Sequence, residues 1–313
     1  MAHNQTMFKL NTGAQIPAIG FGTWQDAEAQ EQAVVTAIKA GYRHIDTAFV
    51  YGTEEAVGKG IKKAGIPRDQ IFITTKLWNN AHHPEDVPKQ LDASLKALGV
   101  DYIDLWLMHW PSAFARGDTL FPKDKDGKPI TGDTDYVDTY KAMEKCLKEG
   151  KVKAIGVSNF SKAEMERLLE KTDVVPAAHE LELHPWLQQT SFTEWHKQKG
   201  IHIIAYSPFG NQNPIYDKGK DIGKLIDDPT LVEIGKKHGK TGAQVALAWN
   251  IAKGHSVLPK SKTESRIKAN FEGDFKLPEE DVKKIDGIDK KLRFCDPSES
   301  FGYKYYTDLD GKE

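Results

Sequence analysis

Short runs of apolar residues alternate with amphipathic stretches along most of the chain. After an opening hairpin at 8–19, turning around Asn11-Thr12-Gly13, eight runs have the length and composition of buried strands. We predict these strands at 20–23, 44–47, 71–76, 103–109, 154–158, 177–183, 202–207 and 256–260. Between them, apolar residues recur at three- and four-residue spacing opposite charged residues. This spacing predicts helices at 28–40, 54–64, 84–98, 136–148, 162–171, 191–199 and 244–253.

Strands that alternate with helices and lack hairpin connections run parallel. Eight such units in about 250 residues have the size of a closed (β/α)8 barrel. We therefore expect an α/β fold, a TIM barrel with an N-terminal hairpin, as a single domain over residues 1–313. A doubly wound sheet is the rival, but it binds a dinucleotide through a Gly-rich turn after its first strand. The pattern begun by Gly20-Phe21-Gly22 has Gln25 where its third glycine belongs, so this fingerprint is missing.

Three segments are longer than ordinary connections: 111–135, 208–228 and the tail after Asp289. The first two follow the fourth and seventh predicted strands, so we expect them to lie over the carboxyl-terminal mouth of the barrel. The tail is rich in aromatic residues, which predicts that it packs against the rest of the protein. These residues are Phe294, Phe301, Tyr303, Tyr305 and Tyr306.

The charge balance and the cysteine content exclude several classes of protein. The 43 Lys and Arg nearly cancel the 45 Asp and Glu, and a net charge of -2 supplies no field for nucleic acid or an anionic membrane. Any phosphate site must therefore be local. Cys146 and Cys295 are far apart and lie outside any metal-like spacing, so we expect no disulfide framework, no bound metal and a reducing compartment. The amino terminus lacks an apolar signal segment, and no apolar run approaches the roughly 20 residues that span a bilayer, which together predict a cytoplasmic protein.

Polar residues gather at the predicted carboxyl ends of the strands, where TIM barrels carry their active sites. One such residue alone is most often a solvated edge charge, whereas groups from seven of the eight strands indicate a site. In chain order these residues are Asp46 with Tyr51 close behind, Lys76, His109, Ser158 and Asn159, Glu180 and His184, Tyr206 and Ser207, and Lys260.

A carboxylate, a phenol, an ammonium and an imidazole suit proton transfer to a carbonyl. Tyr51 has an ordinary pKa of about 10 and needs a neighbour that lowers it. Lys76 close to the phenol would do so, and Asp46 would keep that ammonium charged. A neutral His109 could donate a hydrogen bond to the substrate oxygen. None of these groups can donate a hydride, so reduction requires a nicotinamide cofactor.

The residues at these positions resemble those of the aldo-keto reductases. Nearly the whole chain matches, in the family's order, and it looks most similar to the fungal-like glycerol dehydrogenase and aldehyde (aldose) reductase branch. The matching motifs are Gly22-Thr23-Trp24, HIDTAFVYGTEEAVGKGI at 44–61, TTKLW at 74–78, DLWLMHWP at 104–111, GVSNF at 156–160, LHPW at 183–186, AYSP at 205–208 and LPKSKTESRIKAN at 258–270.

The resemblance implies a role for each matched position. Tyr51 corresponds to the general acid, and Lys76 and Asp46 to the pair that activates it. His109 corresponds to the residue that orients the carbonyl. Cofactor contacts are implied for Gly22, Thr23, Trp24, Ser158, Asn159, Glu180, Tyr206, Ser207, Lys260, Ser261, Arg266 and Asn270. The implied substrate pocket consists of Trp24, Phe49, Trp78, Trp110, Phe121 and Cys295.

Two features of the implied cofactor site are specific to this chain. Similar sequences commonly carry Asn-Gln where it has His179-Glu180, and an ionised Glu180 cannot donate to the nicotinamide carboxamide oxygen. A cationic cluster with backbone donors suits a 2′-phosphate, so the expected cofactor is NADP(H). This cluster consists of Lys260, Ser261, Lys262, Thr263 and Arg266.

These features predict an NADP(H)-dependent oxidoreductase that reduces small aldehydes and ketones and oxidises glycerol or another polyol in reverse. A nucleotide-binding regulatory subunit of the same fold is a second possibility, although it does not explain the pocket aromatics. A TIM-barrel hydrolase is a third, although the chain lacks a matched acid pair or metal ligands. The expected partner is a small carbonyl or alcohol substrate, and the expected state is a monomer, with a weak dimer as the alternative.

Overall fold

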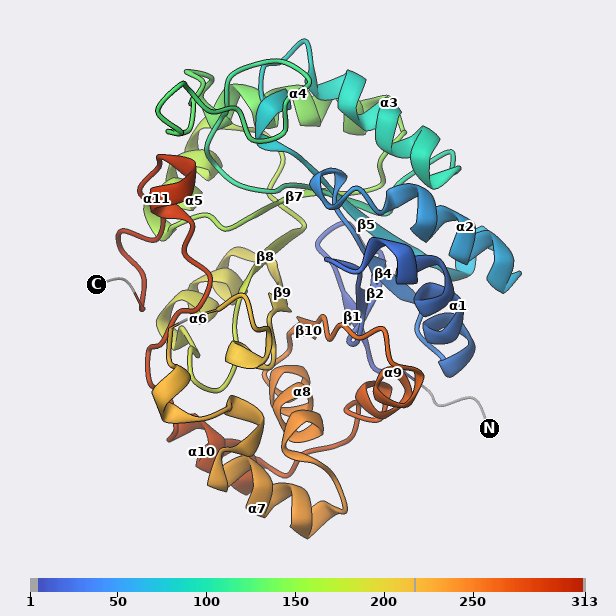
Figure 1. Ribbon diagram of the computed structural model, residues 1–313, viewed down its shortest axis with the longest axis vertical. Helices are drawn as coiled ribbons and strands as arrows, with labels where there is room; N and C mark the ends of the chain where they lie inside the picture. Colours follow the sequence, from blue (N-terminus) through green and yellow to red (C-terminus); the bar gives the residue numbers. More distant parts are fainter. Residues whose placement is uncertain (1–4, 217, 312–313) are drawn as a thin grey trace.

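An eight-stranded parallel sheet forms the centre of the computed structural model, which describes residues 5–216 and 218–311 (Figure 1). Its strands follow the chain in order from β3 to β10. Gly20 N donates to Val257 O at 2.9 Å and Val257 N to Ala18 O at 2.8 Å, so the first and last strands meet. The predicted (β/α)8 fold and its strands are confirmed. The strands are β3 (Phe21–Gly22), β4 (His44–Asp46), β5 (Phe72–Leu77), β6 (Leu105–Met108), β7 (Ile155–Ser158), β8 (Ala178–Glu182), β9 (His202–Tyr206) and β10 (Ser256–Val257).

Helices surround the sheet, and three of them, α2, α4 and α5, have the predicted bounds. Helix α1 begins later than predicted because the 3-10 turn η1 (Ala27–Ala29) precedes it. The helices are α1 (Gln30–Ala40), α2 (Glu54–Ala64), α3 (Val87–Leu98), α4 (Tyr136–Lys148), α5 (Lys162–Lys171), α6 (Thr190–Lys199), α7 (Pro229–His238), α8 (Gly242–Ala252), α9 (Glu264–Phe271), α10 (Glu279–Asp286) and α11 (Ser298–Phe301).

Helix α7 was not predicted, and α8 begins before its predicted start. The Asp228 carboxylate accepts a hydrogen bond from Thr230 N, and Pro229 occupies the first position of α7. Thr241 and Gln244 form a capping box at the start of α8. Asp-Pro and Thr-x-x-Gln are helix-start signals that can be recognised in a sequence, so both errors were avoidable.

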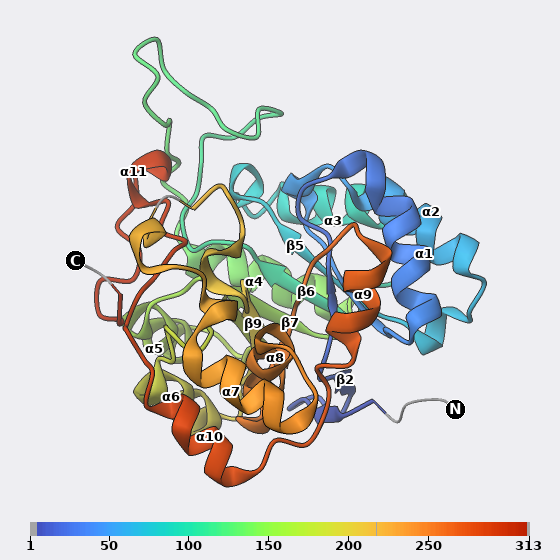
Figure 2. The same cartoon turned by 60° about the horizontal axis from the view of Figure 1, so that its bottom comes forward.

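The two ends of the barrel differ in their packing. At the amino-terminal end, a buried cluster that includes Ile16, Leu105, Leu107 and Ile204 fills the interior. The antiparallel hairpin of β1 (Met7–Lys9) and β2 (Gln15–Pro17) contributes Ile16 to this cluster. Figure 2 shows this hairpin at the bottom, opposite the long green loop at the top. The amino-terminal end is therefore packed for stability, which leaves the carboxyl-terminal end for a site.

The long segments lie at the carboxyl-terminal end. Figure 2 shows the 111–135 segment rising above the barrel near α11. The 208–228 segment is built from the 3-10 turns η5 (Gly210–Gln212), η6 (Lys220–Ile222) and η7 (Leu225–Asp227). In the tail, Tyr305 and Tyr306 are buried, and the Tyr305 ring lies 4.8 Å from the Trp110 ring between centroids, which confirms that the tail packs. In the described parts of the chain, no helix is both long and apolar enough to span a membrane.

Candidate active site

The structure brings together the four residues predicted to be catalytic. Asp46 is the last residue of β4, and Tyr51 ends the 3-10 turn η2 (Phe49–Tyr51) that follows it. Lys76 lies near the end of β5, and His109 directly follows β6. Because β4, β5 and β6 are consecutive parallel strands, these side chains gather at one end of the barrel.

Lys76 is the centre of this group. Its Nζ donates to Asp46 Oδ1 at 2.6 Å and to Thr47 O at 2.9 Å. The same nitrogen lies 5.4 Å from the centroid of the Tyr51 ring. Thr23 Oγ1 donates to Asp46 O at 2.8 Å and so helps to fix the strand that carries Asp46. The predicted ion pair beside the phenol is therefore present.

The pKa of Tyr51 is raised, whereas the sequence predicted a net lowering. Burial is the largest cause, and the neighbouring carboxyl groups of Asp46 and Glu180 act in the same direction. The Lys76 ammonium lowers the pKa of Tyr51, as expected, but it does not outweigh the other effects. The prediction was wrong because it left out the desolvation of the phenol. Tyr51 is thus held as the neutral phenol, the form that can donate a proton.

The neighbours of Tyr51 hold complementary charge states. Burial disfavours the Lys76 ammonium, but Asp46 and Glu180 outweigh this effect and raise the pKa of Lys76. Burial, followed by the charge of Lys76, lowers the pKa of His109 well below its usual value. The His109 ring packs edge-on to the Tyr51 ring, with 5.7 Å between centroids. A neutral His109 beside a neutral Tyr51 places two hydrogen-bond donors at one spot.

Ser158 and Asn159, predicted to bind the carboxamide, already hydrogen-bond to protein groups. Ser158 Oγ donates to Glu180 O at 2.9 Å, and Asn159 Nδ2 donates to His109 O at 3.1 Å. Asn159 Oδ1 accepts from Tyr206 Oη at 2.6 Å and from Tyr306 Oη at 3.0 Å. The sequence indicated only that Tyr306 packs. The sequence did not predict the hydrogen bond between Tyr306 and Asn159, because this bond joins the tail to the residue after β7, far away along the chain.

Glu180 lies against Lys76, a contact that the sequence did not predict. Its Oε1 lies 3.2 Å from Lys76 Nζ, and its side chain is buried. Strands β5 and β8 are not neighbours in the sheet, so the pair forms across the barrel interior. No linear spacing in the sequence signals such a contact.

The predicted 2′-phosphate cluster contains an anion of the protein itself. Lys260 and Lys262 both pair with Asp26, and Lys262 Nζ lies 2.8 Å from Asp26 Oδ1. These ion pairs lower the pKa of Asp26, and its backbone is left-handed with φ 53°. The adjacent Gln25 accepts from Asn213 Nδ2 at 2.9 Å, which ties this turn to the 208–228 segment. The sequence did not reveal this role of Asp26.

The other predicted cofactor residues lie around the same end of the barrel. Gly22 N donates to Pro259 O at 3.0 Å, beside Lys260. Ser207 Oγ, directly after β9, lies 3.1 Å from Tyr216 Oη in the 208–228 segment. Arg266 is exposed in α9, whereas Asn270 at the end of that helix is buried. Ser261 Oγ accepts from Thr263 N at 3.0 Å and shapes the turn before α9.

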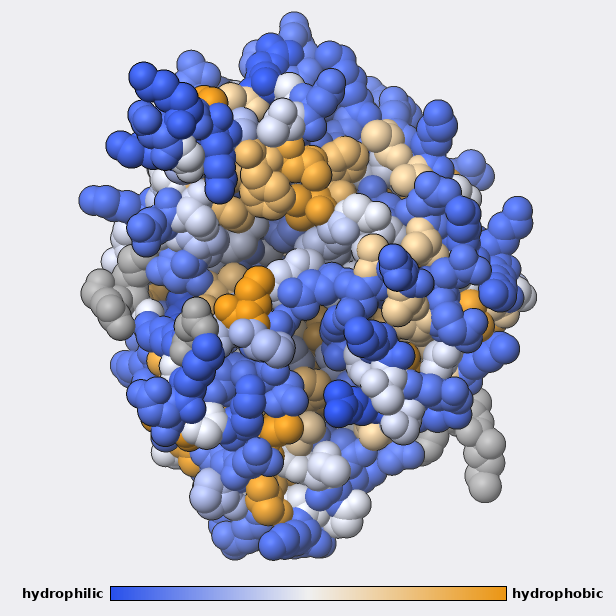
Figure 3. Space-filling model, viewed as in Figure 1, coloured by the Kyte–Doolittle hydropathy of each residue, from blue (hydrophilic) through white to orange (hydrophobic). Residues whose placement is uncertain are grey.

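Most of the predicted substrate-pocket residues form one aromatic cluster. Trp78 packs against Phe121 at 5.2 Å and against His109 at 5.4 Å between ring centroids. Trp110 belongs to this cluster, and Phe49 and Cys295 pack against it. In the part of the chain that the structure describes, Trp24 is not a member of this cluster, and it is 36% exposed. The structure adds Phe114, Leu120 and Phe301, and Figure 3 shows apolar surface beside a central recess on this face.

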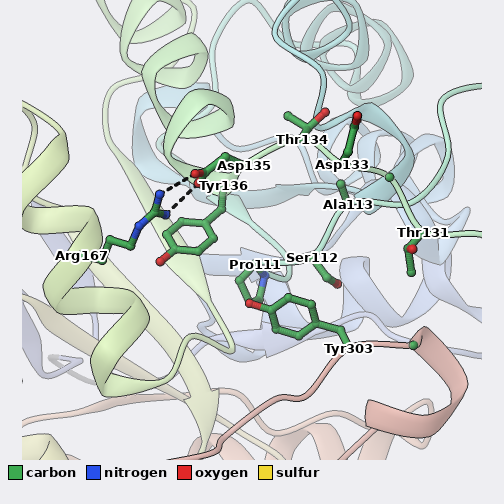
Figure 4. Close-up of a pocket in the computed structure, with 12 residues that line it drawn as sticks. Pro111, Ser112, Ala113, Thr131, Asp133, Thr134, Asp135, Tyr136, Arg167 and Tyr303 are labelled. Atoms are coloured by element: carbon green, nitrogen blue, oxygen red, sulfur yellow. Dashed lines mark hydrogen bonds and ion pairs between the residues drawn. The ribbon is translucent and has the colours of Figure 1, made fainter.

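A separate pocket of about 380 Å³ lies between the 111–135 segment, the start of α4, α5 and the tail (Figure 4). The Arg167 guanidinium pairs with the Asp135 carboxylate at one side, with Nη1 and Oδ1 2.8 Å apart. Tyr303 of the tail also lines this pocket (Figure 4). The residues around this pocket include none of the predicted catalytic, cofactor or substrate residues, so the pocket is distinct from the candidate site.

Known proteins are similar to this chain in sequence and in fold. Residues 18–290 match the family described as the aldo/keto reductase family. The chain is 50% identical over 290 residues to an uncharacterized oxidoreductase of Schizosaccharomyces pombe, covering 92% of this chain and 89% of the relative. It is 45% identical over 295 residues to the D/L-glyceraldehyde reductase of Hypocrea jecorina, covering 90% of this chain and 87% of that relative. The structure of the aldose reductase from Schistosoma japonicum superimposes with a TM-score of 0.89 at 35% identity, over 97% of this chain and 99% of the other. The chain belongs to the aldo/keto reductase family of oxidoreductases.

Proposed function

We propose that the protein reduces small aldehydes and ketones with NADPH, and that Tyr51 is the proton donor. The observation that carries this proposal is the buried Lys76–Asp46 ion pair beside the Tyr51 ring, with Lys76 Nζ 5.4 Å from its centroid. Similarity to a relative named D/L-glyceraldehyde reductase supports a small aldehyde as substrate.

The chain's own residues fit a nicotinamide cofactor. The half-buried Tyr206 ring at the end of β9 offers a face on which a ring can stack. The two proposed carboxamide ligands, Ser158 and Asn159, lie side by side, with Asn159 Nδ2 3.1 Å from Ser158 Oγ. At the other end, Lys260 and Lys262 provide cations for phosphate oxygens.

The proposed reaction assigns one task to each residue. A bound nicotinamide cofactor supplies the hydride. His109, as a neutral imidazole, donates a hydrogen bond to the carbonyl oxygen and orients it. Tyr51 gives its hydroxyl proton to the oxygen as negative charge develops there, and the Lys76 ammonium stabilises the phenolate that remains. Asp46 holds Lys76 in its charged state.

The reverse reaction needs the phenolate of Tyr51 as proton acceptor. Because burial raises the pKa of Tyr51, this form becomes available only as the pH rises. We therefore expect the oxidation of glycerol or another polyol to be slow at neutral pH and faster at alkaline pH. A rate profile against pH with NADP⁺ and glycerol measures this difference.

We expect NADP(H) to bind more tightly than NAD(H). Arg266→Ala should weaken NADP(H) binding about tenfold or more and leave NAD(H) nearly unchanged, since a charge-assisted hydrogen bond contributes about 1.5–3 kcal/mol. Fluorescence titration with each cofactor measures both affinities. Lys268→Ala, which removes a cation of α9 that pairs with Glu264 at 2.6 Å, is the control and should change neither. Equal affinities of the parent protein for both cofactors would contradict the proposal.

We expect the aromatic cluster around Trp78 to favour small or unbranched aldehydes over fused-ring ketones. None of the predicted pocket residues is cationic, so a uronic acid would have no anchor for its carboxylate there. A panel of aldehydes, aldoses, uronic acids and steroid ketones at fixed NADPH tests this expectation. Glyceraldehyde and simple aromatic aldehydes should give the highest kcat/KM. Higher values for steroid ketones or uronic acids would refute the assigned substrate class.

A further inference from the structure

Three ionisable side chains meet inside the barrel without access to water. Lys76 Nζ lies 2.6 Å from Asp46 Oδ1 and 3.2 Å from Glu180 Oε1. The exposed fraction is 0% for the lysine side chain and 3% for each carboxyl side chain. If both carboxyl groups were ionised, the cluster would carry one uncompensated negative charge, which is strongly unfavourable in a buried site.

The groups around the cluster do not supply the missing positive charge. His44 and His109 both experience the charge of Lys76, and burial lowers the pKa of His44 to about 3 and that of His109 well below its usual value. Both histidines are therefore neutral. Tyr51 is a neutral phenol because burial raises its pKa, and Glu54, which also experiences the charge of Lys76, is an acid and supplies no positive charge. The negative charge of the cluster is therefore neutralised by a proton on one of the two carboxyl groups.

The oxygen atoms indicate where this proton lies. Asp46 Oδ2 and Glu180 Oε2 are both buried, and neither has a hydrogen-bond donor among the described residues. Two ionised carboxylates can only accept, whereas a protonated carboxyl group can donate to an ionised one. Burial, the charge of Asp46 and a hydrogen bond with Asp46 raise the pKa of Glu180 well above its usual value, against the effect of Lys76.

We propose that Asp46 and Glu180 share one proton at neutral pH, with the Glu180 Oε2 hydroxyl donating to Asp46 Oδ2. The cluster of Asp46, Lys76 and Glu180 then has no net charge, and Lys76 stays an ammonium beside Tyr51. Glu180 is in this way a positioning residue that helps to hold the Lys76 ammonium beside Tyr51.

The shared proton also explains how a glutamate can stand at a position where the family resemblance leads one to expect glutamine. A glutamine side chain has an oxygen that can accept from Lys76 and an NH2 group that can donate to Asp46. A protonated Glu180 has the same arrangement of acceptor and donor. Glu180→Gln should therefore preserve the cluster and the fold, and it should leave cofactor binding unchanged or tighter.

Infrared difference spectroscopy detects the shared proton directly. A protonated carboxyl group has a carbonyl band that an ionised carboxylate lacks. At pH 8 the spectrum of the wild type minus that of Glu180→Gln should contain this band. The spectrum of the wild type minus that of Asp46→Asn should contain the carbonyl band too, because in this variant Glu180 would be left alone with Lys76 and would ionise. Absence of the band from the first difference would overturn the proposal, as would its persistence in Asp46→Asn.

The dependence of stability on pH gives a second test. Unfolded Glu180 loses its proton near the ordinary carboxyl pKa of about 4.3, whereas folded Glu180 keeps it. The folded state then binds more protons, so wild-type stability falls as the pH rises above this value. Glu180→Gln has no such proton. Its Tm should exceed that of the wild type by a margin that widens by about 2 °C per pH unit between pH 5 and 8.

Glu182→Gln is the matched control, since Glu182 is a buried acid on the same strand. Its carboxylate accepts from Phe294 N and Cys295 N, each at 2.8 Å. Although burial opposes it, the contact with His184 lowers the pKa of Glu182, so this group is ionised in the folded state. Glu182→Gln should be less stable than the wild type at every pH from 5 to 8, because Phe294 N and Cys295 N lose an ionised acceptor, whereas Glu180→Gln should be the more stable protein. A constant margin for Glu180→Gln, or its failure to fold, would overturn the proposal.

The role of the shared proton in supporting Tyr51 rests on the proposed function. The position of the proton between Glu180 and Asp46 does not rest on it. The infrared and thermal measurements require neither a cofactor nor turnover. A protein that shows the shared proton but reduces no carbonyl would contradict only the proposed function. A protein that reduces carbonyls without the shared proton would contradict only this inference.

Discussion

Tyr51→Phe should abolish carbonyl reduction and leave cofactor binding close to that of the parent protein. The substitution removes the hydroxyl that donates the proton and keeps the ring that packs against His109, with 5.7 Å between centroids. Loss of general acid catalysis should lower kcat by about 10²- to 10⁴-fold or more. Steady-state reduction of glyceraldehyde, combined with a fluorescence titration of NADPH, separates turnover from binding.

Tyr42→Phe is the control for this experiment. Tyr42 is also a buried phenol, but its hydroxyl donates to Ile267 O of α9 at 2.9 Å and not to a proposed catalytic residue. Its removal should cost about 1 kcal/mol of stability and leave kcat unchanged. Near-normal reduction by Tyr51→Phe would mean that another group protonates the product, and the proposed mechanism would be wrong.

Lys76→Met should also lose most of its activity. Without the ammonium, burial and the neighbouring carboxyl groups would raise the pKa of Tyr51 further, so transfer of its proton becomes less favourable. We expect kcat to fall by about 10²-fold or more. Thermal denaturation of the same sample shows whether the variant is folded.

Lys151→Met provides a matched surface substitution, because Lys151 is a partly exposed lysine paired with Asp92 at 2.7 Å. It should retain normal kinetics. Normal activity of Lys76→Met would contradict the assigned role of Lys76 and would leave the buried contact with Asp46 without a catalytic purpose.

The fold could be predicted from the sequence because its signals are local. Each buried strand is a short apolar run, and each outer helix has an apolar face repeating at helical spacing. Helices α2, α4 and α5 were predicted to the residue for this reason. The alternation of the two patterns then predicts parallel strands, and the rule that TIM barrels carry their sites at the carboxyl ends of the strands selected Asp46, Lys76 and His109.

Contacts between distant segments could not be predicted in this way. Glu180 reaches Lys76 across the barrel, Asp26 pairs with Lys260 at the junction of the first and last strands, and Tyr306 reaches Asn159 from the tail. Each contact depends on the three-dimensional register of elements far apart in the sequence. The pKa of Tyr51 was mispredicted for a related reason, since the burial of a phenol depends on every segment that covers it.

The most direct test of the proposed function is to mix the purified protein with NADPH and glyceraldehyde and to follow the absorbance of the reduced nicotinamide. We predict steady oxidation of NADPH that depends on glyceraldehyde and disappears in Tyr51→Phe. Binding of NADPH without oxidation would instead indicate a regulatory subunit of the same fold. A protein that neither binds nor oxidises NADPH would contradict the account altogether.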